Sequence, residues 1–227
     1  FPTRRSSDLV VVITGGSKGI GLSCAHGFLA EGARVAIVSR DAGNLARAQA
    51  ELAAAFPSAA GASPARLMTV SGEMSDPAAT TSMIEQVEKA MGPIDVLVTS
   101  AGAARRTPPD ELTPAAWRAA MDAKYFSYVF PIDAVIKRMA TRGAGVIVNV
   151  IGAGGKVASP VHMAGGAANA ALMLVTAGMV RLSIMPQLRV TDTPSPALMD
   201  STPLVADSRV APSSKAMVKS TYDTGPE

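Results

Sequence analysis

Residues 10–21 read Val-Val-Val-Ile-Thr-Gly-Gly-Ser-Lys-Gly-Ile-Gly, and this stretch decides the fold. A short apolar run of buried-strand type leads straight into a glycine-rich turn, and a helical pattern follows. Glycines allow a tight turn and let backbone N–H groups approach a phosphate, and the helix N-terminus adds about half a positive charge there. A glycine motif between a strand and a helix is the context of a dinucleotide-binding turn, so we expect a pyrophosphate to bind here.

The alternation continues along the chain. Apolar runs predict strands at 10–13, 35–38, 66–70, 94–98, 146–150 and 188–190. Helices are predicted at 20–31, 44–55, 77–91, 114–140 and 167–184, with Asp76 and Thr113 as N-caps before a proline. Alternating helices and wholly apolar strands mean a parallel sheet covered on both faces. We therefore expect a single α/β domain over residues 10–190, a doubly wound parallel sheet with its ligand at the carboxyl ends of the strands.

Composition excludes several classes of protein. Of the 227 residues 48% are hydrophobic, which is too many for a disordered chain. The net charge of +3 is small and scattered, so we expect no nucleic-acid partner. A single cysteine, Cys24, allows no internal disulfide and fits the cytoplasm. His26 and His162 lack metal-ligand partners at suitable spacing, and the apolar runs look too short for a membrane span, so neither a metal nor a membrane is expected.

Both ends of the chain depart from this pattern. Phe1–Leu9 matches the translation of a common sequencing-adapter end, so we predict a non-native tail and begin the fold at Val10. Residues 191–227 are rich in Ser, Thr and Pro and offer no convincing central strand. We expect a low-order tail there, with the C-terminal strands of the sheet missing or degraded. A frameshift, a truncation and a divergent lid all remain open for this segment.

The end of the second predicted strand indicates which dinucleotide binds. An acidic residue there would accept a ribose 2′-hydroxyl and repel a 2′-phosphate, whereas this chain has Ser39 and Arg40. Lys18 in the glycine turn can reach the same phosphate. Two cations favour NADP over NAD. The alternative is that Arg40 forms a local ion pair with Asp41 instead.

With these residues in hand, the chain resembles the short-chain dehydrogenase/reductase family. Residues 14–21 match its TGxxxGxG turn, and 95–102 resemble its fourth strand and NNAG element with both Asn replaced. Residues 145–155 and 165–172 resemble its fifth strand and active-site helix, and 188–190 its next strand. The resemblance implies a Rossmann-type fold, a nicotinamide cofactor, hydride transfer at a small carbonyl or alcohol, and a homo-oligomer.

The resemblance also assigns cofactor contacts. These fall on the turn and on the second strand's end: Gly15, Ser17, Lys18, Gly19, Ile20, Gly21 and Arg40. Ala101 and Gly102 would flank the adenine ribose, and Glu73 stands where the family has an Asp near the adenine.

The family's four catalytic positions are all replaced. Gly152 stands at the serine, Gly165 at the tyrosine and Asn169 at the lysine, while Lys124 stands at the asparagine. Glycine supplies no acid and Asn169 no charge. The chain therefore keeps the residues that bind the cofactor in such an oxidoreductase, whereas the residues that transfer the proton are replaced.

The replaced site can be rebuilt from other residues. The lysine and asparagine positions look exchanged, so Lys124 can return an ammonium to the same pocket; the alternative is an ordinary surface lysine. His162 is the best candidate for a general acid because histidine as a residue type exchanges protons near neutral pH, although a structural role is the alternative. We therefore predict His162, Lys124 and Asn169 as catalytic, and expect Tyr125 and Tyr128 to be buried core aromatics.

These expectations lead to an NADP-dependent oxidoreductase with a nonstandard site. Two alternatives stay open. One is a catalytically inactive NADP-binding protein of the same fold, and the other is a truncated or frameshifted product.

Overall fold

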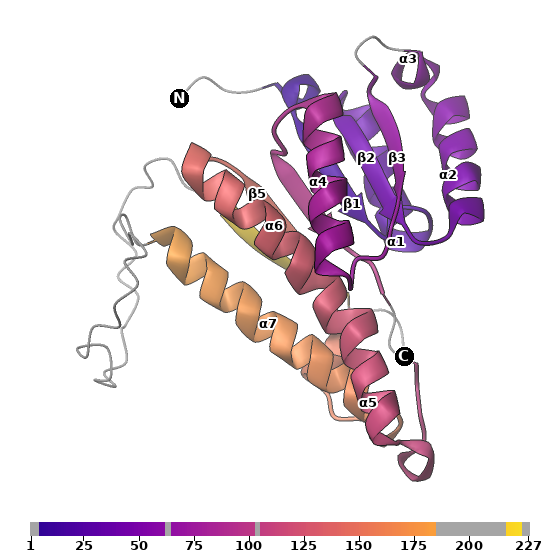
Figure 1. The fold of residues 1–227 in the computed structure, drawn as a ribbon, viewed down its shortest axis with the longest axis vertical. Helices are drawn as coiled ribbons and strands as arrows, with labels where there is room; N and C mark the ends of the chain where they lie inside the picture. The colour runs from indigo at the N-terminus through magenta and orange to yellow at the C-terminus, as the bar shows by residue number, and fades with distance from the viewer. Residues whose placement is uncertain (1–4, 62–64, 103–104, 185–216, 224–227) are drawn as a thin grey trace.

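The computed structural model describes residues 5–61, 65–102, 105–184 and 217–223 (Figure 1). Its centre is a six-stranded sheet in the order β3-β2-β1-β4-β5-β6, in which every neighbouring pair is parallel. The strands are β1 (Val10–Thr14), β2 (Arg34–Ser39), β3 (Leu67–Ser71), β4 (Val96–Thr99), β5 (Val146–Gly152) and β6 (Met217–Asp223). Every strand predicted between residues 10 and 150 is confirmed, and so is the doubly wound α/β fold.

Helices connect the strands and cover both faces of the sheet. They are α1 (Gly19–Ala30), α2 (Ala42–Ala55), α3 (Pro57–Ala60), α4 (Pro77–Met91), α5 (Pro114–Ala120), α6 (Ser127–Arg142) and α7 (Met163–Ile184). The predicted N-caps are confirmed, since the side chains of Asp76 and Thr113 accept hydrogen bonds from the backbone N–H groups of Ala79 and Ala116.

The alternating side chains of the strands build two separate cores. Val10 and Val12 face α4, α6 and α7, which lie on the near side of the sheet in Figure 1. Val11 and Ile13 face the opposite side, where α1 and α2 pack. All four valine and isoleucine side chains are fully buried. An unbroken apolar strand is thus explained by burial on both faces.

The helix predicted at 114–140 is helical throughout but not uniformly α. Between α5 and α6 the segment η3 (Met121–Phe126) is a π-helix. The wider turn of a π-helix inserts a residue into the helical register and changes which side chains face a given direction. Such turns are frequent at functional sites, and this one contains Lys124.

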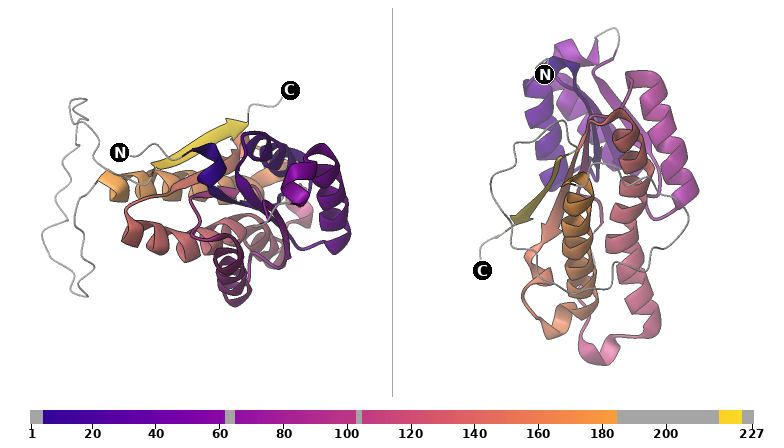
Figure 2. Two further views of the ribbon diagram at one scale, coloured as in Figure 1. Left: turned by 90° about the horizontal axis from the view of Figure 1, so that it is seen from above. Right: turned by 90° about the vertical axis from the view of Figure 1, so that its left-hand side faces the viewer.

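The expectation of a low-order C-terminal tail is wrong for residues 217–223. Residues 217–223 were expected to lie in a low-order tail, yet they form β6, which pairs in parallel with β5 from Val146↔Met217 to Gly152↔Asp223. Figure 2 shows β6 in yellow at the edge of the sheet. An edge strand pairs through its backbone and needs no continuous apolar run, so the mixed sequence at 217–223 concealed it. The strand predicted at 188–190 lies outside the described residues.

The N-terminal stretch and α7 also depart from simple expectation. Ser6–Asp8 form a short 3₁₀ turn, η1, where no helix was expected. The window Pro160–Met179 is long and apolar enough by composition to cross a membrane, contrary to the expectation from sequence. A core helix passes the same test, and Ala168 and Leu172 on α7 are fully buried in this fold.

Candidate active site

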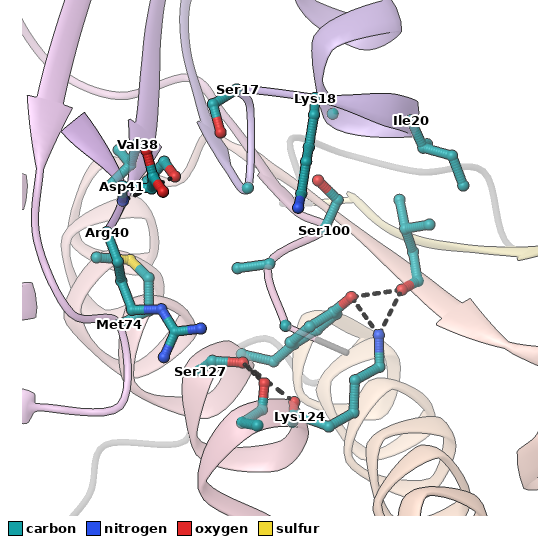
Figure 3. Close-up of a pocket in the computed structure, with 18 of the residues that line it drawn as sticks. Ser17, Lys18, Ile20, Val38, Arg40, Asp41, Met74, Ser100, Lys124 and Ser127 are labelled. Carbon is teal, nitrogen blue, oxygen red and sulfur yellow. Dashed lines mark hydrogen bonds between the residues drawn. The ribbon is translucent and has the colours of Figure 1, made fainter. Parts of the chain in front are cut away.

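A cleft of about 620 Å³ opens at the carboxyl ends of the strands, beside the point between β1 and β4 where the strand order reverses. One end is formed by the glycine turn and the end of β2, and the other by η3, the start of α6 and the end of β5. Figure 3 shows Lys18 and Lys124 pointing into it from opposite sides. The predicted cofactor residues that line it are Gly15, Ser17, Lys18, Ile20, Gly21, Ser39, Arg40, Glu73, Ala101 and Gly102. Of the predicted set, only Gly19 is not part of its wall.

The glycine turn is shaped for a close ligand. Gly15 has φ 69°, which favours glycine, and a side chain there would come within 2.7 Å of the Ala101 Cα. A Cβ on Gly21 would collide with the carbonyl oxygen of Gly15. At Gly15 and at Gly21, which lies at the start of α1, the cleft is therefore lined by backbone without a side chain. That geometry suits the pyrophosphate of a dinucleotide.

The charged groups at the end of β2 do not form the Arg40–Asp41 ion pair that the sequence left as an alternative. Arg40 pairs with Glu73, at 3.0 Å between Arg40 Nη1 and Glu73 Oε2, and not with Asp41. The carboxylate of Asp41 instead accepts from the backbone N–H of Asn44 and caps α2. Burial raises the pKa of Glu73, but hydrogen bonds from Ser75 and from Arg40 lower it more, so its pKa lies below the usual value overall. Glu73 is therefore a carboxylate at neutral pH.

At the opposite end of the cleft, Lys124 and Tyr128 form one hydrogen-bonded group. Lys124 Nζ donates to Tyr128 Oη at 2.7 Å, and Tyr128 Oη donates to the Val150 carbonyl oxygen at 2.6 Å. Lys124 Nζ also lies 3.5 Å from the same carbonyl oxygen and 4.4 Å from the centre of the Tyr128 ring. Dashed lines in Figure 3 mark these contacts. Two groups, the Tyr128 hydroxyl of α6 and the Val150 carbonyl of β5, thus hold the lysine of η3 at the cleft wall.

Burial changes the protonation of both side chains. Desolvation lowers the pKa of Lys124 to about 8, because the ammonium loses water without gaining a carboxylate. Desolvation also raises the pKa of Tyr128 well above its ordinary value, so its hydroxyl stays protonated. Lys124 is therefore the member of the pair that can change charge near neutral pH.

His162 and Asn169 are not part of the cleft wall. They lie near the glycines that follow β5: a Cβ on Gly152 would be 3.1 Å from Asn169 Nδ2, and one on Gly154 would be 3.0 Å from His162 Cδ2. Asn169 is only 4% exposed, and its Oδ1 has no hydrogen-bond partner among the described residues. His162 Nδ1 is likewise buried without a partner in this part of the chain. Of the three predicted catalytic residues, the structure brings only Lys124 into the cleft.

Sequence reasoning missed Tyr128 and Ser100. Tyr128 is fully buried as expected, but it also lines the cleft and contacts Lys124. The signal was available, since residues four apart share a helix face. Ser100 stands in the altered NNAG element, lines the cleft and donates to the Thr14 carbonyl oxygen at 2.7 Å. It ties the end of β4 to the glycine turn.

Comparison with known proteins supports what this geometry suggests. A family model described as short chain dehydrogenase matches residues 9–210. The chain is 33% identical over 149 residues to gluconate 5-dehydrogenase of Gluconobacter oxydans, covering 66% of this chain and 55% of that protein. It is 36% identical over 138 residues to a galactitol 2-dehydrogenase (L-tagatose-forming) of Cereibacter sphaeroides, covering 61% and 50%. The chain thus spans about half the length of these curated relatives.

A solved structure is also similar. It is the NADPH-bound structure of a short chain oxidoreductase from Pseudomonas aeruginosa PAO1 containing an atypical catalytic center. The TM-score is 0.72 at 30% identity, covering 78% of this chain and 67% of the other.

Proposed function

The chain belongs to the short-chain dehydrogenase family, and on that basis we propose that it is an NADP-dependent oxidoreductase with a nonstandard proton-transfer site. The observation that carries the proposal is that the glycine turn and Lys124 line one and the same cleft, at its two ends. The turn supplies a phosphate cradle, and Lys124 supplies a positive charge at the far end of the cleft. That charge would replace the one lost at the family's own lysine position, which is Asn169 in this chain.

The residues of the cleft fit a nicotinamide dinucleotide. Backbone at Gly15 and Gly21 would hold the pyrophosphate, while Ala101 and Gly102 would flank the adenine ribose and Glu73 the adenine. Ser39, Arg40 and Lys18 would take a 2′-phosphate. A bound reduced nicotinamide would supply a hydride to a substrate carbonyl carbon. The NADPH of the similar Pseudomonas structure is consistent with this choice of cofactor.

Lys124 has the main catalytic role in this proposal, as the cation beside the reacting oxygen. Asn169 and His162 would act on this site from behind Gly152 and Gly154, since their side chains do not line the cleft. His162 stays the alternative proton donor. A His162→Ala variant that turns over as fast as the wild type would remove it from the mechanism.

The substrate in this proposal is a small carbonyl or alcohol. The two relatives named for gluconate and galactitol suggest polyhydroxylated compounds as the first to try. Location in the cytoplasm and assembly as a homo-oligomer belong to the same proposal. The exposed apolar side of α7, with Met163 and Leu174, supports association.

Arg40→Ala tests the cofactor assignment. Because Arg40 would contact only the 2′-phosphate, the variant should bind NADPH at least about tenfold more weakly while NADH binding changes little. Fluorescence titration of the reduced nicotinamide measures both constants. Lys137→Ala, which removes a positive charge from an exposed position of α6 outside the cleft wall, is the control. Equal losses for the two cofactors would contradict the assignment to the 2′-phosphate.

A second candidate is a protein that binds NADP without chemistry. Gly152 and Gly165 favour it, because neither position offers an acid or a hydroxyl. Tight NADPH binding combined with no oxidation of NADPH across a panel of ketoses, aldoses and simple ketones would support this candidate.

A further inference from the structure

The group formed by Lys124, Tyr128 and the Val150 carbonyl has the parts of a proton-donating site. We propose that Lys124 Nζ is the group that protonates the substrate oxygen, and that Tyr128 is the residue that positions it. This inference rests on the proposed function and names the proton source that the replaced tyrosine position, Gly165, no longer supplies.

The geometry restrains Lys124 on one side and leaves it open on the other. Its Nζ donates to Tyr128 Oη at 2.7 Å and lies 3.5 Å from the Val150 oxygen. An ammonium has three N–H groups, and these two acceptors use at most two of them. At least one N–H of Lys124 is therefore left for a group bound in the cleft, which Lys124 lines together with Gly152 and Ser127.

Tyr128 is suited to positioning and unsuited to donating. Its single hydroxyl hydrogen is directed to Val150 O at 2.6 Å, and its ring is fully buried. Val150 lies near the carboxyl end of β5, where it pairs with Thr221 of the edge strand β6. A strand carbonyl therefore fixes the tyrosine, and the tyrosine fixes the lysine.

The surroundings of Lys124 keep its ammonium unpaired. β5 and the part of α7 described with side chains, 163–179, carry no titratable group. Asp122 and Tyr125 are the other titratable residues of η3, and Arg118 is the charged residue of α5, which packs against η3. Lys124 makes no salt bridge with any described residue. Lys18 faces it across the cleft, and His162 lies behind Gly154. Burial without a carboxylate lowers the pKa of Lys124 to about 8, which suits a donor working near neutral pH.

The step balances without a further reactant. As the carbonyl carbon gains the hydride, the C=O π electrons move to the oxygen, which takes a proton from Lys124 Nζ. One N–H bond breaks and one O–H bond forms, which leaves an alcohol and a neutral amine. The amine keeps its contact with Tyr128 and regains a proton from water.

Competitive labelling of the full-length protein with trace acetic anhydride, read by peptide mass spectrometry across pH, measures the pKa of Lys124 without any turnover. We expect a pKa of about 8 in the wild type. Tyr128→Phe keeps the ring and deletes only the hydroxyl acceptor, so the pKa should fall by about one more unit. Tyr125→Phe, which deletes a hydroxyl on η3 that makes no contact with Lys124, should leave it unchanged. If the pKa of Lys124 equals that of an ordinary lysine, or does not change in Tyr128→Phe, the proposed positioning of Lys124 by Tyr128 is overturned.

Turnover separates a proton donor from a fixed charge. Lys124→Arg keeps the positive charge but gives up no proton near neutral pH, so kcat should fall about 100-fold or more while the Kd for NADPH stays within about threefold. Tyr128→Phe should shift the pH profile of kcat in parallel with the labelling result. An arginine variant that turns over at the wild-type rate overturns the donor role and leaves the proposed function intact. A folded wild type that binds no NADPH instead overturns the proposed function itself.

Discussion

Arg40 and Glu73 show how a cofactor preference can depend on one exposed ion pair. Their side chains are 65% and 41% exposed, so water screens the pair and its contribution to stability is small. Such a pair exchanges partners readily. An arriving 2′-phosphate would compete with Glu73 for the guanidinium, and the Glu73 carboxylate would repel it.

Replacing Glu73 should therefore strengthen NADPH binding. Glu73→Gln keeps the side-chain size but removes the negative charge, so we expect NADPH affinity to rise about two- to fivefold with little change for NADH. Parallel titrations with both cofactors measure the ratio. Glu85→Gln, whose partner Arg138 lies away from the cleft, is the charge-matched control. A loss of affinity for NADPH alone would mean that Glu73 orients Arg40 for the phosphate and does not compete with it, and a loss for both cofactors would mean that Glu73 mainly contacts the adenine.

Individual elements of the fold are joined by one buried polar bridge. Asn149 on β5 is fully buried, accepts from Thr99 Oγ1 of β4 at 2.7 Å and donates to Thr176 Oγ1 of α7 at 2.8 Å. Thr176 in turn donates to the Leu172 carbonyl at 2.7 Å. The bridge thereby connects β5 with its neighbour β4 and with the covering helix α7. Its three hydrogen bonds are all shielded from water.

Asn149→Leu should destabilise the protein although it adds apolar volume. The change leaves the Thr99 hydroxyl buried without its acceptor, so the free energy of unfolding should fall by about 2–3 kcal/mol. Urea unfolding followed by circular dichroism measures it. Thr81→Ala removes an exposed hydroxyl bonded only within α4 and should cost no more than about 0.5 kcal/mol. A loss as small as that for Asn149→Leu would mean that the bridge contributes no net stability.

The molecule as a whole presents one helix with two contrasting faces. Ala168 and Leu172 of α7 are buried, while Met163 and Leu174 are 39% and 76% exposed. Met163 and Leu174 are eleven residues apart, close to three full turns, and therefore lie on the same side. Ala167 and Ala170, also exposed, fall between them. This outward stripe of apolar and small residues agrees with the association expected from the family resemblance.

Leu174→Glu should weaken that association. A charge in the middle of an apolar contact is costly to bury, so the apparent mass should fall toward that of the 23.1 kDa chain. Light scattering after size-exclusion chromatography measures it. Thr81→Glu places the same charge on an exposed position of α4 and should leave the mass unchanged. A wild type that is already monomeric would refute the proposed oligomer.

The order of elements could be predicted from sequence because it is encoded locally. The apolar run at 10–13, the glycines behind it and the caps at Asp76 and Thr113 act within a few residues of themselves. For the same reason the sequence located the cleft: parallel strands place the ends of β1, β2 and β4 on one edge of the sheet. The phosphate turn and the positions of Arg40 and Lys124 were therefore available from residues alone.

Contacts between distant segments could not be predicted in this way. Arg40 pairs with Glu73, thirty-three positions away, and not with adjacent Asp41, because Asp41 caps α2. Lys124 and Tyr128 acquire their shared acceptor only when η3 packs near the end of β5, twenty-two to twenty-six positions on. β6 exists through backbone pairing with β5, which no local pattern of side chains announces. The sequence by itself determined the fold and the cofactor turn, through short-range propensity and periodicity. Only tertiary packing decided the hydrogen-bond partners of Arg40 and Lys124 and the protonation of Lys124, since burial and long-range hydrogen bonds depend on the assembled fold.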